Sequence, residues 1–129
     1  MRVFVLFICL FVSSFAVAQN VEVIGVLRNN SGTWEAIDNS GHSPVNIESV
    51  SATTSGITVN FTFTASKVRT FIVGVDETYA GMGYVCGASA GFDNAIIKCA
   101  VSGTYINHII DSQVPYSNLW IYGVFDDGQ

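Results

Sequence analysis

Residues 57–64 read ITVNFTFT, and this stretch decides the fold class. Apolar side chains occupy every odd position, and Thr or Asn occupies every even position. Strict alternation with a period of two is typical of a strand in an antiparallel sheet that packs one face on a core and exposes the other to solvent. The stretch therefore predicts a half-buried antiparallel strand over residues 57–64.

The chain on either side of this strand is built from similar short runs. Examples are VEVIGVLR (21–28), VRTFIVGVDE (68–77) and NLWIYGVF (118–125), separated by turn residues, with residues 65–67 as one link. No segment shows helical periodicity. About nine such strands at spacings near ten residues predict an all-β antiparallel sandwich, jelly-roll or immunoglobulin-like. No linker divides residues 19–129, so we expect a single domain.

Two cysteines frame a predicted hairpin in residues 84–99, YVCGASAGFDNAIIKC. If residues 91–94 form its loop, Cys86 lies directly opposite Cys99. Opposed Cβ atoms in an antiparallel pair are about 4.5–5.5 Å apart, close to the roughly 3.8 Å that a disulfide needs. The spacing predicts a hairpin closed by a Cys86–Cys99 disulfide, with a loop of about 14 residues.

The N-terminus has the pattern of a secretory signal peptide. Arg2 precedes an apolar run over residues 3–12, and Ala16-Val17-Ala18 is a small-x-small cleavage site. An uncleaved membrane anchor is the alternative, but the run is shorter than the roughly 20 residues of a spanning helix. We expect cleavage near Ala18 and a secreted or envelope location, periplasmic or extracellular. In a eukaryotic pathway, sequons at Asn29 and Asn60 would be candidate glycosylation sites.

Charge and composition exclude several function classes. Residues 19–129 carry four basic and ten acidic side chains, a net charge of −6, which disfavours nucleic acid and anionic membranes as partners. His42 and His108 lack the spacing of metal ligands. Acidic pairs occur at residues 76–77 and 126–127, but the D-x-D-x-D-G calcium loop is absent. No metal or cofactor is predicted.

A G-x-S-x-G motif around Ser89 suggests the nucleophile elbow of serine hydrolases. Asp93 and His108 follow it in the order of a catalytic triad. The elbow also requires a long helix after the serine and crossover helices in the sheet, and the sequence predicts neither. We therefore predict a protein without enzymatic activity, and a small secreted hydrolase using Ser89 remains an alternative.

Aromatic side chains supply the candidate binding residues. Polar-capable rings are favoured on surfaces that bind a partner while staying soluble. Two segments combine such rings with Gly, Pro or Asn: YAGMGY (79–84) and PYSNLW (115–120). We expect them to form recognition loops at one end of the sandwich. The candidate binding residues are Tyr79, Met82, Tyr84, Tyr116 and Trp120.

Residues 31–91 show a further set of features: a strand around Trp34, the step GHSPVNI, the alternating ITVNFTF, the run ASKVRTFIVGVDE and the Gly-rich CGASAG. Together they resemble the small β-domains of phage virion and tail-associated proteins. The resemblance implies a β-domain with a structural role in a virion or fibre. The leader departs from that pattern, because virion proteins assembled in the cytoplasm are not exported. A protein sent to the cell envelope fits better.

These observations lead to one expected function and one main alternative. We expect an exported, non-catalytic recognition module that binds a protein or glycan on a cell surface or envelope. The alternative is a self-assembling structural protein, since low charge and open β edges favour homo-oligomers.

Overall fold

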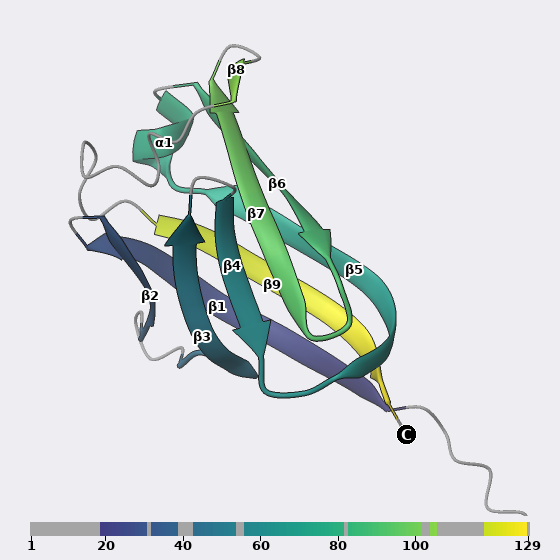
Figure 1. Ribbon diagram of the computed structural model, residues 1–129. Helices are drawn as coiled ribbons and strands as arrows, with labels where there is room; N and C mark the ends of the chain where they lie inside the picture. Colours follow the sequence, from purple (N-terminus) through teal and green to yellow (C-terminus); the bar gives the residue numbers. More distant parts are fainter. Residues whose placement is uncertain are drawn as a thin grey trace, which may run out of the picture.

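The structure is a computed structural model that describes residues 19–30, 32–38, 43–53, 56–81, 83–101, 104–105 and 118–128; at residues 78, 79, 101, 104 and 105 it describes the backbone alone. Two antiparallel sheets pack against each other, which confirms the predicted all-β sandwich (Figure 1). We call them the terminal sheet, which contains the first and last strands, and the hairpin sheet. Nine strands lie within the described residues, as the spacing of the runs predicts.

The terminal sheet has the strand order β2-β1-β9-β5. Its strands are β1 (Asn20–Asn30), β2 (Thr33–Ile37), β5 (Ala65–Val75) and β9 (Asn118–Asp127). The hairpin sheet has the order β3-β4-β7-β6, and β8 pairs with the end of β7. Its strands are β3 (Ile47–Thr53), β4 (Gly56–Phe61), β6 (Tyr84–Ala90), β7 (Asn94–Val101) and β8 (Thr104–Tyr105). This order differs from the ABED and CFG sheets of immunoglobulin constant domains.

The stapled hairpin is confirmed in its register. β6 and β7 pair antiparallel, with Cys86 opposite Cys99, and the two residues form a disulfide. Gly91 N donates to Asn94 O and closes the turn. The disulfide lies toward the core, where Cys99 is buried. Counting residues across the turn predicts the Cys86–Cys99 pairing correctly because one short turn joins β6 directly to β7.

The strand predicted over residues 57–64 is shorter in the structure. β4 ends at Phe61, because the chain there leaves the hairpin sheet and crosses to the terminal sheet. Phe61 N donates to Asp93 O, and Ala65 N donates to Phe92 O, which holds the crossing against the β6–β7 turn. Residues 65–67, predicted as a link, instead begin β5. Phe63 still reaches the core through a stacked contact with Phe61.

Among the described residues one short helix interrupts the strands, although the sequence predicts none. α1 (Glu77–Gly81) connects β5 to β6 and overlaps the start of the segment 79–84 predicted as a recognition loop. It is a single turn, in which Ala80 N donates to Asp76 O. A segment this short has no helical periodicity to detect, so pattern analysis reads it as a loop.

Four phenylalanine rings form the aromatic centre of the core. The Phe125 ring centroid lies 5.0 Å from that of Phe61, 5.4 Å from that of Phe63 and 6.2 Å from that of Phe71, all in T-shaped (edge) geometry. Gly123 makes room for them: a Cβ at this position would lie 2.7 Å from both the Phe125 and Phe71 rings. The glycine in the middle of β9 is thus required by close packing.

Candidate functional site

The outer face of the terminal sheet is apolar, although its inner face already covers the core. Along β9 the inward residues Leu119, Ile121 and Phe125 are buried. Trp120 and Tyr122 alternate with them and therefore point to the opposite face. Antiparallel sheets commonly place polar residues on the side away from the core. This sheet departs from that pattern.

Strand register collects the outward residues into rows that cross the sheet. Val26 of β1 lies between Ile37 of β2 and Trp120 of β9. One step along, Ile24 lies between Val45 and Tyr122, and Tyr122 is opposite Ile72 of β5. We call these residues, with Val124, the apolar face. Its members are Ile24, Val26, Ile37, Val45, Ile72, Trp120, Tyr122 and Val124.

Several side chains of the apolar face remain accessible to solvent. Ile72 is 58% exposed, Trp120 46%, Val45 40% and Tyr122 37%. Val45 joins the face through a two-way backbone pairing with Ile24, with N–O distances of 2.8 and 3.3 Å. Val26, in the middle of the face, is buried, so the exposed part is formed by these four side chains. Neighbouring exposed apolar side chains mark an interaction site more often than scattered ones do.

Polar groups border the apolar face at both ends. At one end Arg28 Nε donates to Asn118 Oδ1 at 3.2 Å, and Glu35 lies opposite Arg28. At the other end the Tyr122 hydroxyl donates to Glu22 Oε1 at 3.1 Å. This hydrogen bond, with burial, raises the pKa of the Tyr122 phenol. An apolar centre within a polar rim is the usual anatomy of a protein interface.

Asp126 and Arg69 complete the border beyond Glu22. Arg69 Nε donates to Asp126 Oδ1 at 2.9 Å, and the pair also forms a salt bridge of 2.9 Å through Arg69 Nη2. The Asp126 side chain is mostly covered, whereas that of Arg69 is half exposed. The hydrogen bond from Arg69 holds the pKa of Asp126 below its ordinary value.

The Arg69–Asp126 pair makes the free energy of unfolding depend on pH in the acid range. Because the pKa of Asp126 is lower in the folded state, its contribution is complete above the unfolded pKa of about 3.9 and disappears as the pH falls through the folded pKa. We expect Asp126→Asn to lower the melting temperature at pH 7, with the difference from wild type shrinking below about pH 4. Thermal unfolding followed by circular dichroism from pH 2 to 7 tests this, with Glu48→Gln as an exposed control. A constant difference across that range would contradict it.

Of the five predicted binding residues, the structure describes the side chains of two, Tyr84 and Trp120. Trp120 lies on the apolar face, and Tyr84 is half buried and packs against the core. Tyr79 lies in α1, where its side chain is outside the described residues, as are Met82 and Tyr116 altogether. Asn118 N donates to Asp76 Oδ2 at 2.6 Å, so the start of β9 lies beside α1. The structure therefore brings Trp120 to the end of the sandwich that carries α1.

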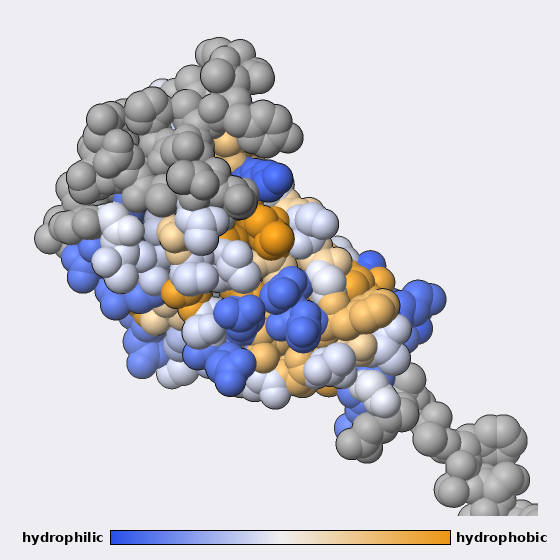
Figure 2. All heavy atoms as spheres, viewed as in Figure 1, coloured by the Kyte–Doolittle hydropathy of each residue, from blue (hydrophilic) through white to orange (hydrophobic). Residues whose placement is uncertain are grey.

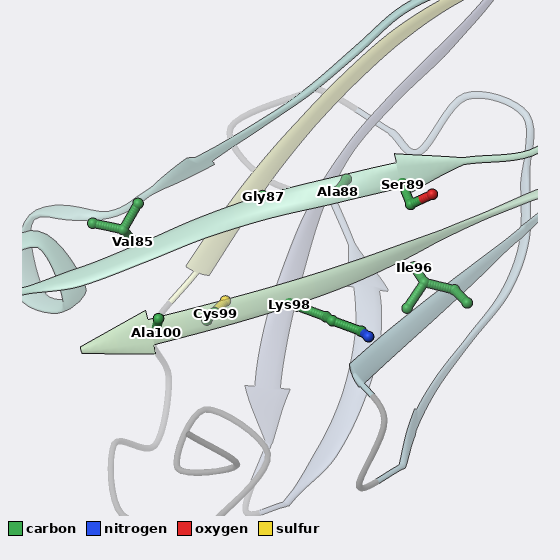
Figure 3. Close-up of a pocket in the computed structure, with 8 residues that line it drawn as sticks. All are labelled: Val85, Gly87, Ala88, Ser89, Ile96, Lys98, Cys99 and Ala100. Carbon is green, nitrogen blue, oxygen red and sulfur yellow. The ribbon is translucent and has the colours of Figure 1, made fainter. Parts of the chain in front are cut away.

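Ser89 of the G-x-S-x-G motif lies on a strand instead of a strand-to-helix turn. It is exposed on β6, opposite Ile96 of β7, beside a shallow groove of about 550 Å³ on the outer face of the hairpin sheet (Figure 3). Lys98 also lines the groove and extends toward Gly56 of β4. A Cβ added at Gly56 would lie 3.3 Å from Lys98 Cγ. Asp93 lies in the hairpin turn, and His108 is outside the described residues.

The described part of the chain offers neither a metal site nor a membrane-spanning helix. No group of three His, Cys, Asp or Glu residues there could hold a metal ion, and no helix there is long and apolar enough to cross a membrane. Asn29 is fully buried and its Oδ1 accepts from Gly32 N at 2.8 Å, so the fold leaves no room for a glycan at this sequon. Asn60 is half buried and Nδ2 donates to Ser49 Oγ.

The apolar face was not predicted, although the sequence contains a signal for it. VEVIGVLR and NLWIYGVF are apolar at both odd and even positions over their central residues. Such runs are typical of strands that are covered on both faces.

Comparison of the chain with protein-family models, curated proteins and solved structures finds no match. The apolar face is therefore the feature of the described residues that bears most directly on function.

Proposed function

We propose that this protein is an exported, non-catalytic recognition module that binds a partner protein on a cell surface or envelope through the apolar face. The observation that carries the proposal is the pair of apolar rows on the outside of the terminal sheet. β1 and β9 present apolar side chains on both faces. Their inner face meets the core, and the proposal assigns the outer face to a partner.

The chemistry of the face favours a protein as the partner. Trp and Tyr are enriched in protein interfaces and at binding hot spots, because they bury a large area at low entropic cost. Aliphatic groups from Val45 and Ile72 extend the surface on either side of the rings. A glycan would require more polar partners, and the Tyr122 hydroxyl already donates to Glu22.

Two further observations support export. The leader over residues 1–18 has the pattern of a signal peptide. The Cys86–Cys99 disulfide is compatible with an oxidising compartment outside the cytosol. The net charge of −6 over residues 19–129 keeps the protein soluble despite the exposed apolar face.

The proposal predicts that binding is lost when the face loses its anchors. In Ile72→Thr/Trp120→Thr, each truncation should cost more than about 1 kcal/mol, so affinity should fall by at least about 30-fold. The probe is fluorescently labelled protein of residues 19–129, titrated onto intact cells of the source organism. Binding should also disappear after the cells are treated with trypsin.

The matched control is Val85→Thr/Ile96→Thr, which removes exposed apolar groups from the outer face of the hairpin sheet. It should bind as wild type. Equal loss in both variants, or undiminished binding by Ile72→Thr/Trp120→Thr, would contradict the assignment. Binding that survives trypsin but not glycosidase would replace the protein partner with a glycan.

A self-assembling structural protein is the second candidate. The observation that favours it is an unprotected strand edge at β6, on the opposite sheet from the apolar face.

A further inference from the structure

β2, β5, β3 and β6 lie at the ends of the two described strand orders, and three of these four carry features that block pairing with another chain. β5 contains Lys67 and Arg69, and its register with β9 shifts twice. β3 contains Glu48 at a register shift, and β2 is only five residues long, with Glu35 at its centre. Charged residues, irregular register and short length are the usual protections of sheet edges.

β6 lacks all of these protections. Its sequence, YVCGASA, contains no charged residue and no proline. It pairs with β7 in an unbroken register from Tyr84 to Ala90. No described strand pairs with its other side. β6 is therefore a neutral edge strand of regular register, the kind of edge that can accept another strand.

The hydrogen-bonding groups at this edge can be assigned from the register. The Cα atoms of Cys86 and Cys99 are 4.0 Å apart, the spacing of a non-hydrogen-bonded pair. Because pair types alternate, Ala88 and Ile97 also form a non-hydrogen-bonded pair. The backbone N–H and C=O of Cys86 and Ala88 therefore point away from β7, toward the open edge.

The second half of the edge is accessible and bears small side chains. Gly87, Ala88 and Ser89 are all exposed, although Ile97, opposite Ala88, is buried. β5 runs close beside β6 on this side of the sandwich (Figure 1), with Cα atoms within 8 Å of one another, but is not paired with it. A Cβ at Gly87 would meet nothing within 4 Å. The exposure of Gly87, Ala88 and Ser89 therefore leaves this half of the edge accessible to another backbone.

We propose that β6 pairs antiparallel with β6 of a second copy of this chain, on a two-fold axis at Ala88. Ala88 then exchanges hydrogen bonds with Ala88 of the second copy, and Cys86 with Ala90. Gly87 meets Ser89 across the axis, where small side chains permit close contact. The two hairpin sheets join into one continuous sheet.

A second copy fits this edge better than an unrelated strand does. A two-fold contact presents the same surface twice, and an antiparallel strand with equally spaced outward groups is complementary to itself. Because β6 contains no charged residue, its own side chains bring no charge to the contact. On the outer face around the hairpin, hydrophobic residues lie among hydrophilic ones (Figure 2), so backbone pairing is the main attraction. We expect a weak dimer, with Kd on the order of 10–1,000 µM.

Sedimentation velocity of the oxidised protein, residues 19–129, tests the proposal across a concentration series to about ten times that Kd. The mass should rise from monomer toward dimer. Ala88→Pro removes an N–H that points to the edge and leaves the β6–β7 bonds intact, so it should remain monomeric. Gly87→Lys places like charges near the axis and should also remain monomeric. In the monomer its Cβ has free space, and the added charge lies opposite Lys98 of β7, which weakens the β6–β7 pair slightly.

Thr58→Lys is the matched control, because it adds the same charge to the central strand β4. It should dimerise as wild type. A wild-type protein that stays monomeric throughout, or β6 variants that dimerise normally, would overturn the proposal. Dimerisation abolished by Ile72→Thr/Trp120→Thr and not by the β6 variants would move the contact to the apolar face, and would overturn it as well. Gly87→Lys keeps the test valid if Ala88→Pro fails to fold.

Discussion

Phe125→Ala is expected to destabilise the domain by about 3–5 kcal/mol, the usual cost of removing a fully buried phenylalanine from a core. Phe125 has no exposed surface, and three other phenylalanine rings pack against it. The rings come from both sheets and from the crossing between them, so the cavity cannot close by moving one strand. A loss of this size is a large share of the roughly 5–15 kcal/mol that stabilises a typical domain.

Equilibrium unfolding in urea measures this loss. Phe92→Ala is the control, since Phe92 lies in the β6–β7 turn with 56% of its surface exposed. Truncation there should change stability by about 0.5 kcal/mol or less. Similar losses in the two variants would show that Phe125 is not at the centre of the core.

Removal of the Cys86–Cys99 disulfide is expected to cost about 3 kcal/mol. The cross-link closes a loop with a sequence separation of 13, and the chain-entropy model assigns roughly this value to such a loop. The double variant Cys86→Ala/Cys99→Ala also removes two sulfur atoms that pack against the core. Its loss should therefore be somewhat larger than that caused by reduction alone.

Thermal and urea unfolding of wild type, with and without dithiothreitol, separate the two contributions. Reduced wild type keeps its sulfur atoms and loses only the cross-link. The double variant should be insensitive to dithiothreitol. If reduction leaves the stability of wild type unchanged, the cross-link does not constrain the unfolded chain as the model requires.

The two proposed surfaces are compatible because they belong to different sheets. A dimer formed through β6 of the hairpin sheet leaves the apolar face of each terminal sheet uncovered. Two such faces in one particle would strengthen attachment to a partner displayed in many copies, without any new contact. Recognition and self-association are then two properties of one molecule, and the experiments above measure them separately.

Local patterns in the sequence determined the elements of this fold. Alternation over residues 57–61 defines β4, and the same period places Phe71, Val73 and Val75 toward the core. The Cys86–Cys99 pairing followed from counting across one turn, because a hairpin joins neighbouring segments. Each of these features depends on residues close together in the chain.

The tertiary structure alone decided which strands are neighbours, and with it both candidate surfaces. β1 and β9 pair although almost a hundred residues separate them, and this register aligns Val26 with Trp120 and Ile24 with Tyr122. The sequence shows that these runs are apolar on both sides, but not which side faces the core. β6 likewise becomes an edge only because β7 takes its other neighbour from β4. Long-range pairing is set by the packing of the whole core, so no local pattern encodes it.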